Sequence, residues 1–304
     1  MAFFDAITID IFRDDLPSPW EFKGKPDSNS GVSFGLTSVL GLEFPELEVF
    51  TQPKGLGDGV FFTGQRFQPR TIEIHAKQLG RTPEDIFHYR RQIMEYFLMN
   101  HDYKIVVEVV DQGSWSTKTR ALNNCKLIAA SYPTIDAADT NPDIVLQFMA
   151  PEAHFEAMTA STKTETNLAD QTFMTVSANG DYKVRPIIKM TCTTSAANMA
   201  KMTISMPDLG LYTRTITGNY YDTTGSYLTL GDVIIFDPEK SSVNINGTDY
   251  EVHPGDAAAF FTNCFLIPNE SIRFSYLPYD TQGNQISGSK WTVEFEWTER
   301  YSGI

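Results

Sequence analysis

The chain has 304 residues, and its 38 acidic side chains against 24 basic ones give a formal net charge of −14. This charge excludes a protein that clamps nucleic acid, because phosphate binding depends on a basic surface that releases counterions. The 41% of hydrophobic residues is enough for a sizeable core, and the length predicts about two domains.

The sequence also lacks the marks of membrane insertion and of a disulfide framework. No stretch approaches the roughly 20 apolar residues of a membrane span, and Asp5, Asp10 and Asp14 stand where a signal peptide carries a basic start and an apolar run. The cysteines lie far apart and form no CxxC pair; they are Cys125, Cys192 and Cys264. We therefore expect no membrane insertion, disulfide or zinc site, and we expect buried thiols in a reducing compartment.

Alternation of apolar and polar residues with a period of two is the main signal along the chain, and it predicts half-buried strands. The alternating apolar sets are Ile7, Ile9 and Ile11; Ile72, Ile74 and Ala76; Ile105, Val107 and Val109; Ile144, Leu146 and Phe148; and Trp291, Val293, Phe295 and Trp297. Between the first two sets, the proline- and glycine-rich stretch Leu16–Gly35 predicts a long irregular connection, which in a compact domain is usually an arm or an interface loop.

One segment breaks the period and predicts an amphipathic helix over residues 83–99. Thr82 is a suitable N-cap, Pro83 suits the first helical position, and the acidic Glu84 and Asp85 favour the positive helix end. An apolar stripe follows at spacings of three, four and seven; it consists of Ile86, Phe87, Ile93, Met94, Phe97 and Leu98.

The sequence changes character around residues 156–180, which are rich in Thr, Ala and Ser and show weak periodicity. We predict a linker there, between one domain over 1–155 and another over 181–304. The second domain is predicted to be all-β, a sandwich or barrel, because short β-rich runs alternate with Gly, Pro, Asn and Asp. Asn246-Gly247 is predicted to be a two-residue hairpin turn.

The sequence motifs that would indicate a catalytic or ligand-binding site are incomplete. Gly31-Val32-Ser33-Phe34-Gly35 fits the G-x-S-x-G nucleophile elbow, but its flanks predict neither the strand before Ser33 nor the helix after it. Gly55–Gly59 precedes a strand-like run, whereas a phosphate-binding loop opens a helix. The five histidines never fall at HxH or HxxxH spacing. We expect no catalytic, cofactor-binding or metal-binding residues, and hence an assembly or binding protein rather than an enzyme.

Several features occur in the same order as in one known family. Leu47–Phe97 resembles the N-terminal domain of the distal tail proteins of siphophages: a turn at Asp58-Gly59, a strand from Arg70 through Ala76, and an Arg-containing helix follow one another. In the second half, residues 177–191 and 221–252 resemble that family's galectin-like sandwich.

The resemblance implies a mainly β fold: an N-terminal split β-barrel-like domain with one α-helix, and a C-terminal galectin-like β-sandwich. It implies a homo-hexameric ring at the tail tip of the virion, assembled in the cytoplasm of the bacterial host. The ring would join the tail tube protein to the tail-associated lysin or baseplate hub, would offer a platform for receptor-binding proteins in host adhesion, and would use no cofactor.

A closed ring requires two different surfaces on each subunit. We expect these surfaces in the Leu16–Gly35 arm and at the hairpin tip Asp111–Lys118. The candidate interface residues are Ser28, Gly31, Phe34, Gln112, Ser114 and Trp115.

Two other functions stay open. One is a carbohydrate-binding module, for which Trp20, Trp115, Tyr220 and Tyr221 offer aromatic rings that stack on sugars. The other is a serine hydrolase that acts through Ser33.

Overall fold

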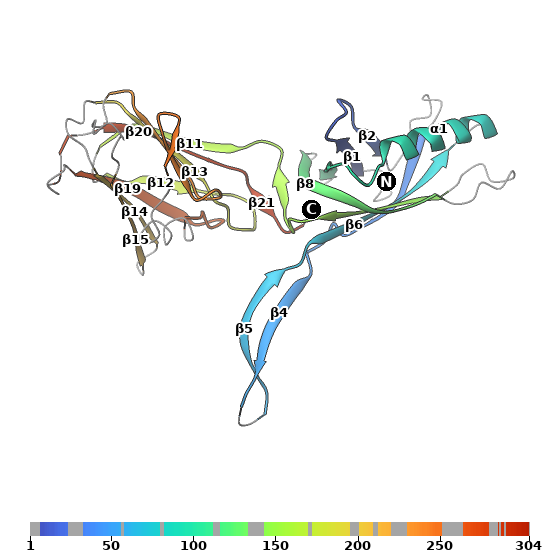
Figure 1. Cartoon of the computed structure of the whole chain (residues 1–304), viewed down its shortest axis with the longest axis horizontal. Coiled ribbons are helices and arrows are strands. Elements are labelled where there is room, and N and C mark those ends of the chain that lie inside the picture. Colours follow the sequence, from blue (N-terminus) through green and yellow to red (C-terminus); the bar gives the residue numbers. More distant parts are fainter. Residues whose placement is uncertain are drawn as a thin grey trace. The chain divides into compact units, whose positions relative to one another are not determined.

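The computed structural model describes residues 7–23, 33–55, 58–79, 82–111, 116–132, 143–169, 172–194, 201–208, 212–219, 230–250, 264–279, 285, 287–288 and 290–303. They form two compact units (Figure 1): Met1–Met158 together with Tyr301–Ile304, and Thr159–Arg300. In the part of the chain that the structure describes, the fold is mainly β with one helix, as predicted. Among the described residues, no helix has the length and apolar character that crossing a membrane requires.

The first unit is built on a closed barrel. Its strands are β1 (Ile7–Arg13), β2 (Trp20–Lys23), β3 (Ser33–Leu40), β4 (Leu47–Pro53), β5 (Val60–Phe67), β6 (Arg70–Leu79), β7 (Tyr103–Asp111), β8 (Ser116–Ser131), β9 (Asp143–Ala150) and β10 (Phe155–Ala157). The sheet runs β8-β7-β1-β2-β3-β6-β9, and pairing of β8 with β9 closes seven strands into a barrel. The alternating residues Ile9, Ile74 and Phe148 are all fully buried, which confirms the predicted inward faces.

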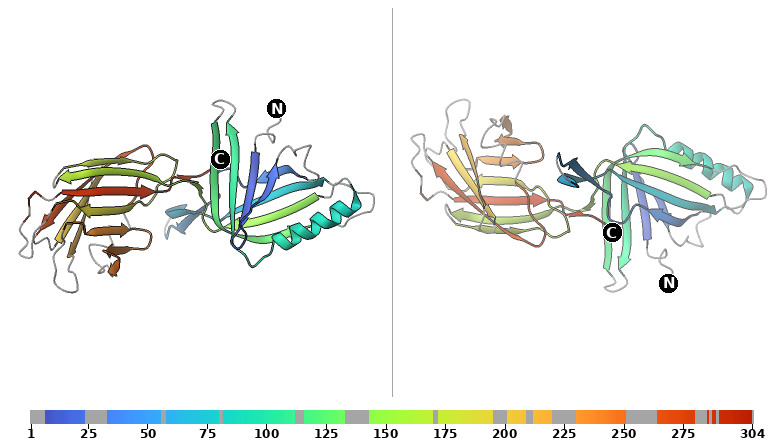
Figure 2. Two further views of the ribbon diagram at one scale, coloured as in Figure 1. Left: turned by 90° about the horizontal axis from the view of Figure 1, so that it is seen from above. Right: turned by 90° about the horizontal axis from the view of Figure 1, so that it is seen from below.

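Helix α1 (Pro83–Tyr96) packs on this barrel (Figure 2). Its start is as predicted: the Thr82 Oγ1 accepts a hydrogen bond from the Asp85 N–H at 3.2 Å, and the Thr82 N–H donates to the Asp85 carboxylate at 3.1 Å. Its end is three residues earlier than the predicted residue 99. Phe97 turns into the core there, and the Tyr103 hydroxyl binds both backbone groups of Leu98 at 2.7 Å.

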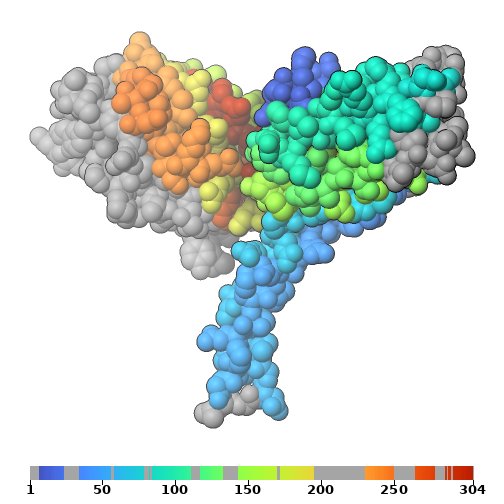
Figure 3. Space-filling model, turned by 45° about the vertical axis from the view of Figure 1, so that its right-hand side comes forward, coloured from blue at the N-terminus to red at the C-terminus, as the bar shows by residue number. Residues whose placement is uncertain are grey.

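Strands β4 and β5 form a two-stranded hairpin that continues β3 and β6 beyond the barrel and stands clear of it (Figure 3). The turn between barrel and hairpin needs a glycine, because Gly41 has φ +88° and a Cβ there would lie 2.0 Å from the Thr71 carbonyl oxygen. This projection is not apparent from the pattern of the sequence.

The second unit is a sandwich of two sheets around one core. Its strands are β11 (Ser161–Ala169), β12 (Met174–Ser177), β13 (Ile187–Cys192), β14 (Lys201–Asp208), β15 (Tyr212–Asn219), β16 (Val233–Asp237), β17 (Ser242–Ile245), β18 (Thr248–Tyr250), β19 (Ser271–Tyr279) and β20 (Lys290–Trp297). One sheet runs β11-β20-β13-β16-β17-β18 and the other β12-β19-β14-β15. Phe274 and Phe295 link the two sheets edge to face, with ring centroids 5.1 Å apart. The Asn246-Gly247 turn between β17 and β18 is confirmed, since both residues have positive φ.

The predicted linker over 156–180 is wrong. Strand β11 pairs with β20 and β12 pairs with β19, so most of this segment belongs to the second unit, and the units divide between Met158 and Thr159. The cause is that β11 is an edge strand whose side chains are exposed on nearly all its length. An edge strand of this kind carries no buried face, so it lacks the alternation that marks the other strands.

The end of the chain returns to the first unit. Arg70 is 4% exposed, and its guanidinium donates to the carbonyl oxygens of Ala153 at 2.8 Å and of Gly41, Glu43 and Ser302 at 2.5 Å. It also lies over the Phe155 ring at 4.7 Å, and burial lowers its pKa to about 10. One buried arginine therefore ties together four segments that are distant in sequence.

Burial also makes the first unit sensitive to alkali. It raises the pKa of Tyr103 to about 12, so between pH 10 and 12 the unfolded chain has lost a proton that the folded chain keeps. The contribution of Tyr103 to the free energy of unfolding is therefore complete below pH 10. It falls as the pH rises above 10, by up to about 1.4 kcal/mol per pH unit. We expect the urea midpoint of the first unit to fall between pH 10 and 11, and Tyr103→Phe to reduce that slope. Equal slopes for the variant and the parent would contradict this assignment.

Candidate docking surfaces on the first unit

Helix α1 presents a second apolar face that the barrel does not cover. Of the predicted stripe, Ile86, Ile93 and Phe97 are buried in the core, whereas Phe87 is 60%, Met94 47% and Leu98 43% exposed. The exposed three are spaced seven and four residues apart, so they follow one side of the helix.

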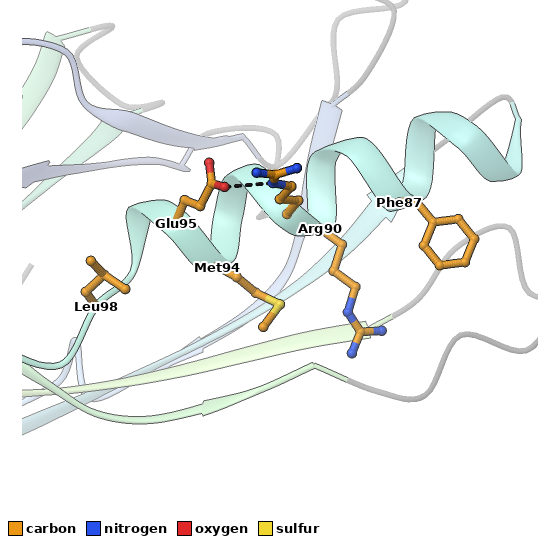
Figure 4. Close-up of a pocket in the computed structure, with 6 residues that line it drawn as sticks. Phe87, Arg90, Met94, Glu95 and Leu98 are labelled. Atoms are coloured by element: carbon orange, nitrogen blue, oxygen red, sulfur yellow. Dashed lines mark hydrogen bonds and ion pairs between the residues drawn. The ribbon is translucent and has the colours of Figure 1, made fainter.

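These three side chains line a shallow groove of about 460 Å³ together with Arg90, Arg91 and Glu95. Figure 4 shows Phe87, Arg90 and Met94 on the same side of the helix. The Arg91 Nε donates to the Glu95 carboxylate at 2.8 Å, which raises the pKa of Arg91. The groove is thus an apolar strip with a net charge of +1, from two arginines and one glutamate.

The β4–β5 hairpin carries a second exposed apolar surface. Cross-strand partners share a face, and the register pairs Leu47 with Phe67, Val49 with Gln65, Thr51 with Phe62 and Pro53 with Val60. On this face Leu47, Val49, Val60 and Phe62 are 42%, 50%, 54% and 63% exposed. We call these four residues the hairpin face.

The opposite side of the hairpin carries Phe50 and Phe61, which are 39% and 58% exposed, with one cation near each ring. The Arg66 guanidinium lies 5.3 Å from the Phe50 ring and the Lys54 ammonium 5.6 Å from the Phe61 ring. Arg66 also pairs with Glu48 at 2.7 Å. The two sides therefore differ in charge: one combines exposed aromatic rings with Glu48, Lys54 and Arg66, whereas the hairpin face has no charged side chain.

The residues predicted for a ring interface are mostly untested. Ser28, Gly31, Gln112, Ser114 and Trp115 lie outside the described residues. Phe34 is a correction: it is 8% exposed and packs on Trp20 and Phe22, with centroids 5.2 and 6.0 Å away, so its side chain belongs to the barrel core. The predicted irregular arm also contains β2, which pairs with β1.

The described residues that were named for the two alternative functions do not support them. Trp20 packs against Tyr96 and Phe97 of the first unit, which leaves it no role as a sugar platform in the sandwich. Ser33 begins a barrel strand that pairs with β6, and strand rather than helix follows it, so the nucleophile elbow has no place here. Trp115, Tyr220 and Tyr221 lie outside the described residues.

Asp14, Asp15 and His101 form a cluster in which one ligand atom from each lies within 4.8 Å of the others. His101 Nδ1 lies 2.9 Å from the Asp14 carboxylate, and the Arg13 Nε donates to Asp15 at 2.5 Å. The hydrogen bond from His101 lowers the pKa of Asp14. Both carboxylates are already bound by side chains of the same surface, Asp14 by His101 and Asp15 by Arg13, which accounts for the cluster without a metal ion.

Sequence reasoning missed both docking surfaces, although the sequence contains a signal for them. Adjacent apolar pairs occur at Phe61-Phe62, Ile86-Phe87, Ile93-Met94 and Phe97-Leu98. In a strand, only one of two adjacent side chains can point toward a single core. In a helix that packs on one side, two adjacent side chains are seldom both buried. The second residue of each helix pair is accordingly exposed, and on the hairpin, which has no core of its own, both Phe61 and Phe62 are exposed.

The fold defines a class of protein: a barrel with one helix and a projecting hairpin, followed in the chain by a β-sandwich. No protein-family model matches the chain, and no curated protein matches it in sequence. Among solved structures, the chain is similar to the SPP1 Dit (gp 19.1) protein, a hub of the adsorption apparatus in phages that infect Gram-positive bacteria. The TM-score is 0.62 at 15% identity, over 96% of this chain and 98% of that chain.

Two further structures are more distant. A protein of the phage P2 baseplate has a TM-score of 0.43 at 7% identity, over 98% of this chain and 99% of that chain. A protein of the sheath-tube complex of an extracellular contractile injection system has a TM-score of 0.30 at 15% identity, over 47% of this chain and 84% of that chain. The predicted resemblance to distal tail proteins is confirmed as a resemblance of fold.

Proposed function

We propose that this protein is a structural component of a phage tail tip, which forms a hexameric ring between the tail tube and the tail-associated lysin or baseplate hub. The observation that supports this proposal is the similarity of both units, across 96% of the chain, to the SPP1 hub protein. The role is structural rather than catalytic. In it the second unit acts as a galectin-like domain that supports host adhesion, and the ring assembles in the host cytoplasm before it enters the virion.

The surface of the first unit supports an assembly role. Exposed apolar side chains gather on α1 and on the hairpin face, and contiguous exposed apolar surface on a subunit marks a protein interface. Six subunits of charge −14 repel one another, so their contacts must bury apolar or locally paired groups. An acidic ring also repels DNA, which suits a conduit that must not retain it.

The test is the mass of the purified protein in solution together with its negative-stain images. Six copies of 34.2 kDa give about 205 kDa, and we expect light scattering to find this mass and images to show a six-fold ring with a central channel. A monomer at about 10 μM, the range in which standard-size interfaces associate, would contradict the proposal.

A further inference from the structure

The hairpin face and the α1 groove share one property: each is an apolar row that its own subunit leaves uncovered. A two-stranded ribbon is marginal in water because it has no core. Here the hairpin face adds four side chains that are 42–63% exposed. The groove offers three side chains that are 43–60% exposed. Since both rows are open in the same subunit, neither covers the other within one chain.

The two rows match in length. Leu47 and Pro53 are six residues apart on a strand, which is about 20 Å at the rise of an antiparallel strand. Phe87 and the helix end at Tyr96 are nine residues apart, which is about 14 Å at the helical rise, and Leu98 extends the row just beyond the helix. A hairpin laid along the groove therefore covers its whole apolar row.

The hairpin as a whole and the groove also carry net charges of opposite sign, with Glu48, Lys54 and Arg66 on the side of the hairpin opposite to its docking face. The groove carries Arg90 and Arg91 against Glu95, a net +1. The hairpin segment 46–68 carries the acids Glu46, Glu48 and Asp58 against Lys54 and Arg66, a net −1. In a protein of net charge −14, a contact between these surfaces avoids the like-charge repulsion that most surface pairs would meet.

We propose that the β4–β5 hairpin of one subunit docks its face of Leu47, Val49, Val60 and Phe62 in the α1 groove of Phe87, Met94 and Leu98 on the next copy. Two different surfaces of one chain meet, so the contact is heterologous, and its repetition closes a ring when six copies complete one full rotation. This inference rests on the proposed ring and names the surfaces that join its subunits.

The first experiment places a charge on each surface in turn. We expect Phe62→Asp and Met94→Asp each to weaken ring formation about tenfold or more, because a buried anchor becomes an unpaired charge. Gln52→Asp on the opposite side of the hairpin and Gln92→Asp on the far side of α1 are matched controls at exposed positions, and we expect them to form rings like the parent. Far-ultraviolet circular dichroism checks that all four variants fold.

The decisive experiment mixes the two defective variants. Phe62→Asp keeps an intact groove and Met94→Asp an intact hairpin, so a mixture has one competent contact per pair of unlike subunits. We expect a mass near twice that of one chain, about 68 kDa, which neither variant reaches alone. As a second measurement, Phe62→Cys combined with Met94→Cys should give a ladder of subunits with a short bis-maleimide, since Cys125, Cys192 and Cys264 are buried. Gln52→Cys combined with Met94→Cys is its control.

The outcomes separate this inference from the proposed function. A ring from the parent together with unchanged rings from Phe62→Asp and Met94→Asp would overturn the docking surfaces and leave the ring standing. A mixture that gives no dimer, although the parent forms rings that both variants abolish, would show that the two surfaces do not contact each other. A monomeric parent would overturn both.

Discussion

Replacement of Arg70 by leucine should lower the free energy of unfolding of the first unit by about 4 kcal/mol, among the largest effects expected of a single substitution. The leucine fills part of the volume but leaves the carbonyl oxygens of Gly41, Glu43, Ala153 and Ser302 without their buried donor. Hydrogen bonds from a charged donor contribute about 1.5–3 kcal/mol each, and a buried acceptor without a partner costs about 1–3 kcal/mol.

Scanning calorimetry and hydrogen exchange can measure this effect unit by unit. We expect faster exchange in β6 and β10, with no change in the strands of the second unit. Arg70→Lys should recover part of the lost stability, because the lysine ammonium keeps the positive charge. It cannot replace the guanidinium fully, since its three donors sit on one atom and cannot reach all four carbonyl oxygens. Arg66→Leu is the matched control: Arg66 pairs with Glu48 on the exposed hairpin, and such pairs contribute about 0–1 kcal/mol. Equal losses at Arg66 and Arg70 would contradict the argument.

The strands that sequence reasoning predicted share one cause. Where one face of a strand packs on the core and the other faces water, apolar and polar residues alternate along the sequence, as at Ile7, Ile9 and Ile11. The helix start was equally predictable, because Thr82 and Asp85 cap it through local hydrogen bonds. Predictions succeeded where the deciding interactions lie within a few residues of one another or repeat along one face.

The remaining features depend on contacts that sequence spacing does not contain. Strand β11 pairs with β20 more than a hundred residues later, and its exposed side chains leave no period. The helix end at Tyr96 depends on the Tyr103 hydroxyl bound to Leu98. The candidate docking surfaces were not predicted for another reason. In the sequence, an apolar residue that binds a partner cannot be distinguished from one that packs in the core.

The last four residues give the second large prediction. Residues 301–304 follow the whole second unit in sequence but belong to the first unit. The Arg120 guanidinium lies 3.7 Å from the Tyr301 ring centroid and donates to the Gly303 carbonyl, and Ser302 accepts from Arg70 at 2.5 Å. The second unit is therefore an insertion within the first, because residues on both sides of it in the sequence belong to the first unit.

Removal of residues 301–304 should destabilise the first unit by about 3 kcal/mol, because it deletes one ring contact and two charge-assisted hydrogen bonds. The second unit should keep its stability, since the Arg300 carbonyl still accepts from the Asp181 and Tyr182 N–H groups at 3.2 and 3.3 Å. Hydrogen exchange on the shortened chain measures both effects at once. Gly303→Ala is the matched control, because a Cβ there meets the Leu42 carbonyl at 3.4 Å, an ordinary contact, and the backbone acceptors remain. Protection of β6, β8 and β10 equal to that of the parent would show that the returning end contributes nothing to the barrel.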